Sequence, residues 1–208
     1  MEVSMFAKEG LPFMVASVLI FLVVLLIPKC LLILLAAFVV FMMFWFFRDP
    51  ERISPVEEGA VVSGADGRIV EIIDTELHGI PYKKISVFMN AFSVHVNRAP
   101  LQGIIEDVRH IEGSFINAAK SKASMENERN EIYMKTPFGK IVVVQVAGLI
   151  ARRCVSYVKT KDGISKGDRL GMIKFSSRVD HYLPANVTVA VGLGDKVKAG
   201  LSVIARVK

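Results

Sequence analysis

The stretch that decides the fold occurs twice in this 208-residue chain, as ISKGDRLG at residues 164–171 and as LGDKVKAG at residues 193–200. In each copy a Gly-Asp pair predicts a tight turn, because glycine adopts backbone angles that other residues avoid. A small residue and a strand-like run follow each turn. The repeat therefore predicts short strands joined by tight turns in the C-terminal part of the chain.

The same texture extends back to Val56. Runs rich in β-branched residues, bounded by Gly and Asp, predict strands at residues 60–62, 68–73, 84–89, 103–108, 132–134, 140–146, 155–158, 187–191 and 202–207. One helix is expected between Ser114 and Met125, which hold alanine and lysine but no proline. Because such paired turns are common in domains of the biotinyl and lipoyl type, we expect residues 48–208 to form a mainly β globular domain. It should be barrel-sandwich hybrid-like, with one or two short helices.

The N-terminal part differs, because residues 11–47 contain a single ionised side chain, Lys29. Two apolar runs, residues 11–27 and 30–47, are 17 and 18 residues long and are separated by Pro28-Lys29. Each run is near the lower limit for crossing about 30 Å of hydrocarbon. We therefore expect an α-helical membrane hairpin, preceded by a short segment of residues 1–10. A buried hairpin of a soluble protein and a hairpin that enters one leaflet are the alternatives.

Charged residues at the ends of the hairpin indicate its orientation. Lys8, Arg48 and Arg52 flank one side, whereas only Lys29 marks the other. The positive-inside rule then places the N-terminus and the globular domain on the cytoplasmic face of the cell membrane. The net charge of +6 fits attraction to anionic lipid headgroups. No cluster of basic residues with interleaved aromatics is present, so nucleic acid is not an expected partner.

Cysteine and histidine usage argues against disulfide or metal chemistry. Cys30 lies in the apolar segment and Cys154 in the globular part, which fits a reducing compartment. The histidines are scattered and have no paired cysteines beside them, so no metal site is expected. They are His78, His95, His110 and His181.

The stretch that carries chemistry is GMIKFSSRVD at residues 171–180. It resembles the self-cleavage motif of the short phosphatidylserine decarboxylases, in which a Gly-Ser bond precedes Arg-Val-Asp. Ser177 matches the serine of that motif. Ser176 stands where the family has glycine, which is the main departure from the pattern.

Other segments match the same family in order. SGADG at residues 63–67 resembles its aspartate motif, so Asp66 corresponds to the catalytic aspartate. VHVNRAP at residues 94–100 resembles its histidine motif, so His95 corresponds to the first histidine. Larger members carry a second histidine where this chain has Arg98. The segments NER, PFG and QVAG also match, at residues 127–129, 137–139 and 145–148.

The resemblance implies a proenzyme that makes its own cofactor. Ser177 would attack the preceding peptide bond, and cleavage between Ser176 and Ser177 would leave a pyruvoyl group at the start of the small chain, with no metal required. His95 and Asp66 would supply the base and the group that orients it. The pyruvoyl group would then convert phosphatidylserine to phosphatidylethanolamine and CO2 through a Schiff base.

Ser176 is expected to affect this processing. Glycine before the nucleophile permits close approach and unusual backbone angles, whereas a side chain there disfavours them. We therefore expect a processing-impaired, uncleaved precursor. Cleavage between Phe175 and Ser176 is an alternative.

Four residues are candidates for binding the lipid headgroup. Arg152 and Arg153 could hold its phosphate, because planar guanidinium groups suit phosphate oxygens. Arg98 and His181 are further candidates from their positions in or near the motifs. The rival hypotheses are a non-catalytic membrane-tethered lipoyl-like adaptor and a decarboxylase of archaetidylserine. Membrane lipids are expected partners, and a homo-oligomer is possible in either case.

Overall fold

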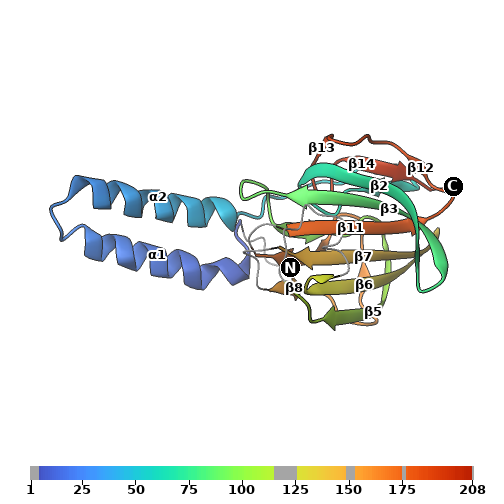
Figure 1. The fold of residues 1–208 in the computed structure, drawn as a ribbon, viewed down its shortest axis with the longest axis horizontal. Helices are drawn as coiled ribbons and strands as arrows, with labels where there is room; N and C mark the ends of the chain where they lie inside the picture. The colour runs from blue at the N-terminus through green and yellow to red at the C-terminus, as the bar shows by residue number, and fades with distance from the viewer. Residues whose placement is uncertain (1–4, 115–125, 149–152, 175–176, 208) are drawn as a thin grey trace. The chain divides into compact units, whose positions relative to one another are not determined.

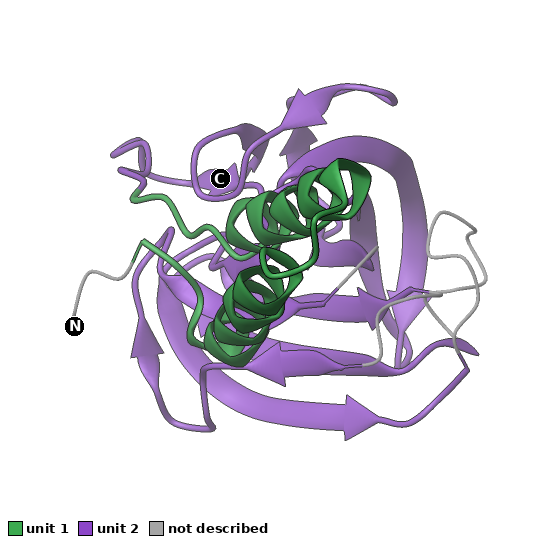
Figure 2. Ribbon diagram, turned by 90° about the vertical axis from the view of Figure 1, so that its left-hand side faces the viewer, with its two compact units in different colours: residues 1–51 green, residues 52–208 purple. Residues whose placement is uncertain are grey.

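The computed structural model describes residues 5–114, 126–148, 153–174 and 177–207. The chain forms two compact units, residues 1–51 and residues 52–208, which Figure 2 shows in separate colours. The boundary expected from the sequence lies between residues 47 and 48, a few residues before the boundary between these units.

The first unit is a helical hairpin. A 3-10 turn, η1 (Lys8–Gly10), leads into α1 (Leu11–Val24), and α2 (Cys30–Phe46) returns beside it (Figure 1). Proline near the start of α1 suits the first helical turn, where the missing N–H has no intrahelical partner. Gly10 allows the ends of the hairpin to close, because a Cβ there would lie 2.3 Å from Cγ of Phe47.

The two helices are shorter than the apolar runs that predict them, with 14 residues in α1 and 17 in α2. Both helices expose large apolar side chains, among them Leu19, Leu22 and Leu34. Among the residues that the structure describes, no helix is both long and apolar enough to cross a membrane.

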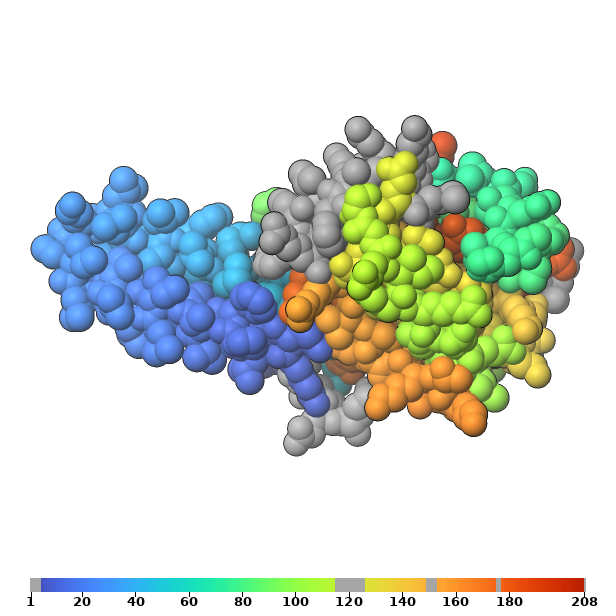
Figure 3. All heavy atoms as spheres, turned by 60° about the horizontal axis from the view of Figure 1, so that its bottom comes forward, coloured from blue at the N-terminus to red at the C-terminus, as the bar shows by residue number. Residues whose placement is uncertain are grey.

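The second unit is mainly β, as predicted, and its largest sheet has eight antiparallel strands. Their order is β13 (Lys196–Val197), β2 (Gly67–Leu77), β3 (Ile80–Met89), β11 (Ser177–Pro184), β7 (Gly139–Ala147), β6 (Arg129–Thr136), β5 (Gly103–Ile111) and β9 (Gly163–Ile164). The sheet curls from one strand to the next along this order (Figure 1). Figure 3 shows β5 on one face of this unit with the segment before β9 beside it, where Lys161 N–H donates to the carbonyl of Ile105 (2.8 Å).

Two smaller sheets complete the domain. One contains β1 (Ala60–Val62), β14 (Val203–Arg206) and β12 (Thr188–Val189), and the other contains β4 (Val96–Arg98), β10 (Arg169–Ile173) and β8 (Cys154–Ser156). The apolar core lies against one face of the large sheet and includes Ile85, Val87, Val143, Val179 and Leu183. β11 is central, because β3 and β7 pair with its two edges.

The repeated stretch forms the turns that the sequence predicts. Gly167 and Gly194 both have φ +87°, a left-handed conformation that favours glycine. In each turn the aspartate side chain accepts a backbone N–H: Asp168 from Ser165 at 2.9 Å and Asp195 from Gly192 at 2.8 Å. The finer expectation of a barrel-sandwich hybrid stays a prediction. The helix expected between Ser114 and Met125 lies outside the described residues, apart from Ser114.

Candidate active site

Ser177 is the first residue of β11 and lies directly between Met89 of β3 and Ala147 of β7. Its side chain is fully buried, and Oγ donates a hydrogen bond to Sδ of Met89 at 3.4 Å. A thioether sulfur is a weak acceptor. The serine hydroxyl is therefore held in a neutral, water-excluded position at one end of the central strand.

His95 is also fully buried and lies just before β4. Its Nδ1 is 2.9 Å from the carbonyl oxygen of Ser93. Because a carbonyl only accepts, Nδ1 carries the hydrogen and donates this bond. The carbonyl of His95 accepts the N–H of Ile173 (3.3 Å), at the end of β10, four residues before Ser177.

Asn97 connects this strand to Ser177. Its Nδ2 donates to Sδ of Met89 at 3.6 Å, the same sulfur that the Ser177 hydroxyl contacts. His95 lies two residues before Asn97, just outside β4.

The partners of Asp66 are Arg52 and Ala199. Arg52 Nη2 donates to Oδ2 at 2.9 Å, Nη1 pairs with Oδ1, and the N–H of Ala199 donates to Oδ1 at 2.8 Å. Arg52 also donates to the carbonyl of Ala199 at 2.7 Å. The observed role of Asp66 is to join the loop before β2 to the chain segments at residues 52 and 199.

Arg98 is a buried part of the scaffold, with 4% of its surface exposed. Its Nη1 donates to the carbonyl of Gly167 at 2.9 Å, and its N–H donates to the carbonyl of Gly64 at 2.9 Å. The side chain thus supports the first turn of the repeated stretch.

His181 links the Gly64 loop to the large sheet. Its Nδ1 donates to the carbonyl of Ile85 at 3.0 Å, and its Nε2 accepts the N–H of Gly64 at 2.8 Å. Burial lowers the pKa of His181, so the ring is neutral and both nitrogens are used. A strand rises about 3.3 Å per residue, which puts His181 about 13 Å along β11 from Ser177.

Arg153 is exposed and adjoins the segment that leads to Ser176, because its carbonyl accepts the N–H of Lys174 at 3.4 Å. Arg152 and Ser176 lie outside the described residues.

An ion-pair network on the other face of β11 was missed by the sequence analysis. Arg178 Nε donates to Asp180 at 2.6 Å, and its Nη2 donates to Ser86 at 2.8 Å and pairs with Glu71. Lys84 also pairs with Glu71, at 2.6 Å. Arg178 and Asp180 are almost fully buried. Alternation of charge in the Arg-Val-Asp sequence was the signal that could have indicated a strand with one ionic face.

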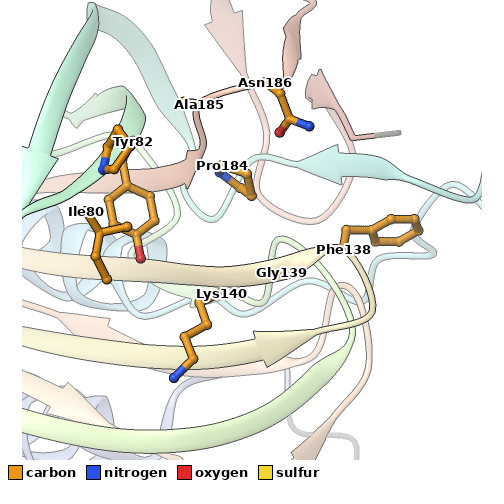
Figure 4. Close-up of a pocket in the computed structure, with 9 residues that line it drawn as sticks. Ile80, Tyr82, Phe138, Gly139, Lys140, Pro184, Ala185 and Asn186 are labelled. Atoms are coloured by element: carbon orange, nitrogen blue, oxygen red, sulfur yellow. The ribbon is translucent and has the colours of Figure 1, made fainter.

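A pocket of about 410 Å³ lies at the opposite end of β11 (Figure 4). Tyr82, Phe138, Lys140 and Pro184 are among its lining residues. Seven residues separate Pro184 from Ser177, about 23 Å of extended strand. The pocket is therefore distinct from the surroundings of Ser177. Among the described residues, no three His, Cys, Asp or Glu side chains are placed to hold a metal ion.

A fully buried serine at the start of a central strand, connected through Met89 to Asn97 of β4, defines a class of site suited to nucleophilic attack within the chain itself. Residues 40–205 match the family model described as phosphatidylserine decarboxylase. The chain is 44% identical over 205 residues to the phosphatidylserine decarboxylase proenzyme of Nitrosomonas eutropha, covering 96% of this chain and 94% of the relative. The proenzymes of Solidesulfovibrio magneticus and Syntrophus aciditrophicus are 44% and 41% identical, over 96% of this chain and 95% and 96% of theirs. The chain belongs to the phosphatidylserine decarboxylase family.

Proposed function

We propose that this chain is a self-processing decarboxylase that converts phosphatidylserine to phosphatidylethanolamine and CO2. The observation that carries the proposal is the place of Ser177. It is a fully buried serine at the first position of a central strand, in a family whose curated relatives are named proenzymes. A solvent-exposed turn serine, the ordinary alternative, would not be enclosed in this way.

The proposed maturation uses groups of the chain alone. Oγ of Ser177 attacks the carbonyl carbon of residue 176, and the C–N bond breaks to give an ester and a free amine at Ser177. Loss of the Cα proton and cleavage of the Cβ–O bond release the carboxylate of the large chain and leave a dehydroalanine. Water then replaces its nitrogen as ammonia, which produces the terminal pyruvoyl group.

His95 is the proposed base for this sequence. Its neutral tautomer presents Nε2 as a proton acceptor, because Nδ1 donates to the Ser93 carbonyl. Burial of the ring keeps water from competing for the proton. Asp66 stays a proposed member of the site. Its proposed role is to fix the loop that contains Gly64, whose N–H donates to His181.

The surroundings of Ser177 fit a pyruvoyl group. When bound, such a group supplies an electrophilic carbonyl that accepts the substrate amine and the electron pair released with CO2. Two uncharged side chains are connected to Ser177 here: Met89 accepts from the hydroxyl, and Asn97 donates an amide N–H to the same sulfur. His95 would return a proton to the substrate carbon.

The headgroup is proposed to bind at Arg152 and Arg153. Arg153 is exposed and its carbonyl contacts Lys174 on the way to the cleavage site. With Arg152 it offers two guanidinium forks for one phosphate. Arg98 and His181 are proposed to shape the site from the scaffold, because their side chains hold the turn at Gly167 and the loop at Gly64.

The hairpin is proposed to hold the enzyme at the cytoplasmic face of the cell membrane. Its exposed apolar side chains favour contact with lipid over water, since large exposed apolar patches commonly mark interaction surfaces. A substrate whose headgroup lies at the membrane surface is best met by an anchored active site.

The experiment is the intact mass of the purified full-length chain beside Ser176→Gly and Ser177→Ala variants, with phosphatidylethanolamine formation measured in phosphatidylserine vesicles. We expect the Ser176→Gly chain to split, with a pyruvoyl-blocked small chain beginning at residue 177, and the unsubstituted chain to stay whole. Ser177→Ala should stay whole and inactive. If neither the Ser176→Gly chain nor the unsubstituted chain splits in the presence of lipid, the proposal is wrong and a non-catalytic tethered module replaces it. A small chain that begins at residue 176 would move the nucleophile to Ser176.

A further inference from the structure

Three buried amide side chains form a hydrogen-bonded series that leads to Ser177. Asn130 Nδ2 donates to Oε1 of Gln145 at 3.2 Å, and Gln145 Nε2 donates to Oδ1 of Asn97 at 2.8 Å. Asn97 and Gln145 are fully buried, and Asn130 nearly so. We call Asn130, Gln145 and Asn97 the amide series.

Both ends of the amide series have polar partners. At the outer end the exposed His110 approaches Oδ1 of Asn130 through Nδ1, at 2.8 Å. At the inner end Asn97 donates to Sδ of Met89 (3.6 Å), which also accepts from the Ser177 hydroxyl (3.4 Å). The series thus runs from the surface of β5 to the candidate nucleophile.

The sulfur fixes the direction of every bond in the series. A thioether only accepts, so Asn97 must face Met89 with its NH2 group. Its carbonyl then faces Gln145, which must donate, and the same requirement passes to Asn130. All three amide dipoles therefore point their donor ends toward Ser177, where bonds in a low-dielectric interior polarise one another.

The backbone is shaped to admit the amide series. A Cβ on Gly171 would lie 2.8 Å from Nε2 of Gln145 and 2.1 Å from the carbonyl oxygen of Val155, so only glycine fits at that point of β10. Amides are expensive to bury, and apolar residues of similar size would fill the same space without hydrogen bonds. A polar series at this place is therefore better explained by what it does to its inner end.

We propose that Asn97 is a positioning residue for the self-cleavage of this chain, an inference that rests on the proposed function. Asn97 holds the Met89 thioether, and the thioether holds the Ser177 hydroxyl hydrogen. The hydroxyl oxygen is thereby kept in one rotamer. The weak acceptor releases the hydrogen when His95 takes the proton. Gln145 and Asn130 act through Asn97, whose orientation they set.

The test compares two identical chemical changes at opposite ends of the amide series. Asn97→Asp and Asn130→Asp each replace one amide donor by a carboxylate oxygen of the same size, in the Ser176→Gly full-length chain. The readouts are the cleavage rate by intact mass and the midpoint of thermal unfolding. Misplacement of a reacting group by about 1 Å costs roughly a hundredfold in rate, so we expect that loss for Asn97→Asp and less than about tenfold for Asn130→Asp. Equal losses of rate that follow equal losses of stability would overturn the proposal.

A second variant protects the test against misfolding. Met89→Leu removes the acceptor sulfur and nearly conserves volume, so its stability should be close to that of the parent. We expect its cleavage to slow at least tenfold, and unchanged cleavage would overturn the proposal. If the parent and the unsubstituted chain both stay whole, the proposed function fails and this inference fails with it. If the parent splits and Asn97→Asp splits equally fast, only this inference fails.

Discussion

The two faces of β11 are both buried, yet they are polar in different ways. Ser177 and His181 share one face with the apolar Val179 and Leu183, and their hydrogen-bond partners are a sulfur, a carbonyl and a backbone N–H. On the other face, Arg178 forms ion pairs with both Asp180 and Glu71.

The difference separates the proposed reaction from the scaffold. The Ser177 hydroxyl has an uncharged partner, so it would keep its proton until the proposed base takes it. The ionic face fixes the strand instead, because Arg178 on β11 contacts Glu71 on β2 and Ser86 on β3. One strand therefore carries the candidate nucleophile on one side and is held by ion pairs on the other.

Removing the charge of Arg178 from the ionic face should have the largest effect on stability. Arg178→Met leaves Asp180 buried without its guanidinium partner, and breaking such a pair costs about 3–5 kcal/mol. The free energy of unfolding in guanidinium chloride should fall by that amount. The control is Lys83→Met, which breaks a half-exposed pair with Asp74 and should change stability by less than about 1 kcal/mol. A loss for Arg178→Met as small as that of the control would show that the ionic face does not hold the strand.

Lower pH should destabilise the neutral face through His181. Burial depresses the pKa of this ring below its ordinary value of 6.5, so near pH 5 to 6 the unfolded chain binds a proton that the folded chain refuses. Its contribution to stability is complete above pH 6.5 and is lost as the pH falls toward the folded pKa. The free energy of unfolding should therefore fall between pH 7 and pH 5, by at most about 1.36 kcal/mol for each pH unit below 6.5.

The matched control is His181→Gln, whose amide can donate to the Ile85 carbonyl and accept from Gly64 without titrating. The pH dependence of unfolding between pH 7 and pH 5 should be smaller in this variant, because the contribution of His181 is removed. Equal pH dependence in both chains would mean that folding does not lower the pKa of His181.

The smallest expected effect concerns the reactivity of the Cys154 thiol and does not involve a change in stability. Burial raises the pKa of its thiol to about 12, and Sγ donates to the Gln145 carbonyl at 3.4 Å. At pH 8 the thiolate fraction, and with it alkylation by iodoacetamide, should be roughly a thousandfold below that of an ordinary thiol. Peptide mass analysis of the native chain should find label on the exposed Cys30 alone. Labelling of Cys154 at the rate of Cys30 would show that water reaches the amide series.

The sequence predicted most strands of the sheets but not the one that carries the site. The runs at residues 84–89 and 140–146 fall within β3 and β7, because β-branched residues pack well on a half-buried surface. β11 was missed. Its residues Ser-Arg-Val-Asp-His-Tyr show no apolar alternation, since polar groups are buried on both faces and satisfied by partners distant in sequence.

The candidate site also has one part that the sequence predicts and another part that only the fold shows. Motifs place Ser177, His95 and Asp66 in one family pattern, but the pairing of Asp66 with Arg52 depends on how residues 52 and 199 approach the loop. Asn97 and Gln145 were named only as letters of matching motifs. Their role at Met89 appears once β3, β4 and β7 lie together.

β11 also determines what maturation would leave behind. Its eight residues pair with β3 and six of them pair with β7. Cleavage before Ser177 would turn this strand into the free beginning of a 32-residue chain that also supplies β12, β13 and β14 to two sheets. The two fragments would stay associated through these sheets, so dilution would not separate them. The domain must therefore fold before it is cleaved. The mature protein would behave as one body with a nick in its interior, and only denaturation would reveal two polypeptides.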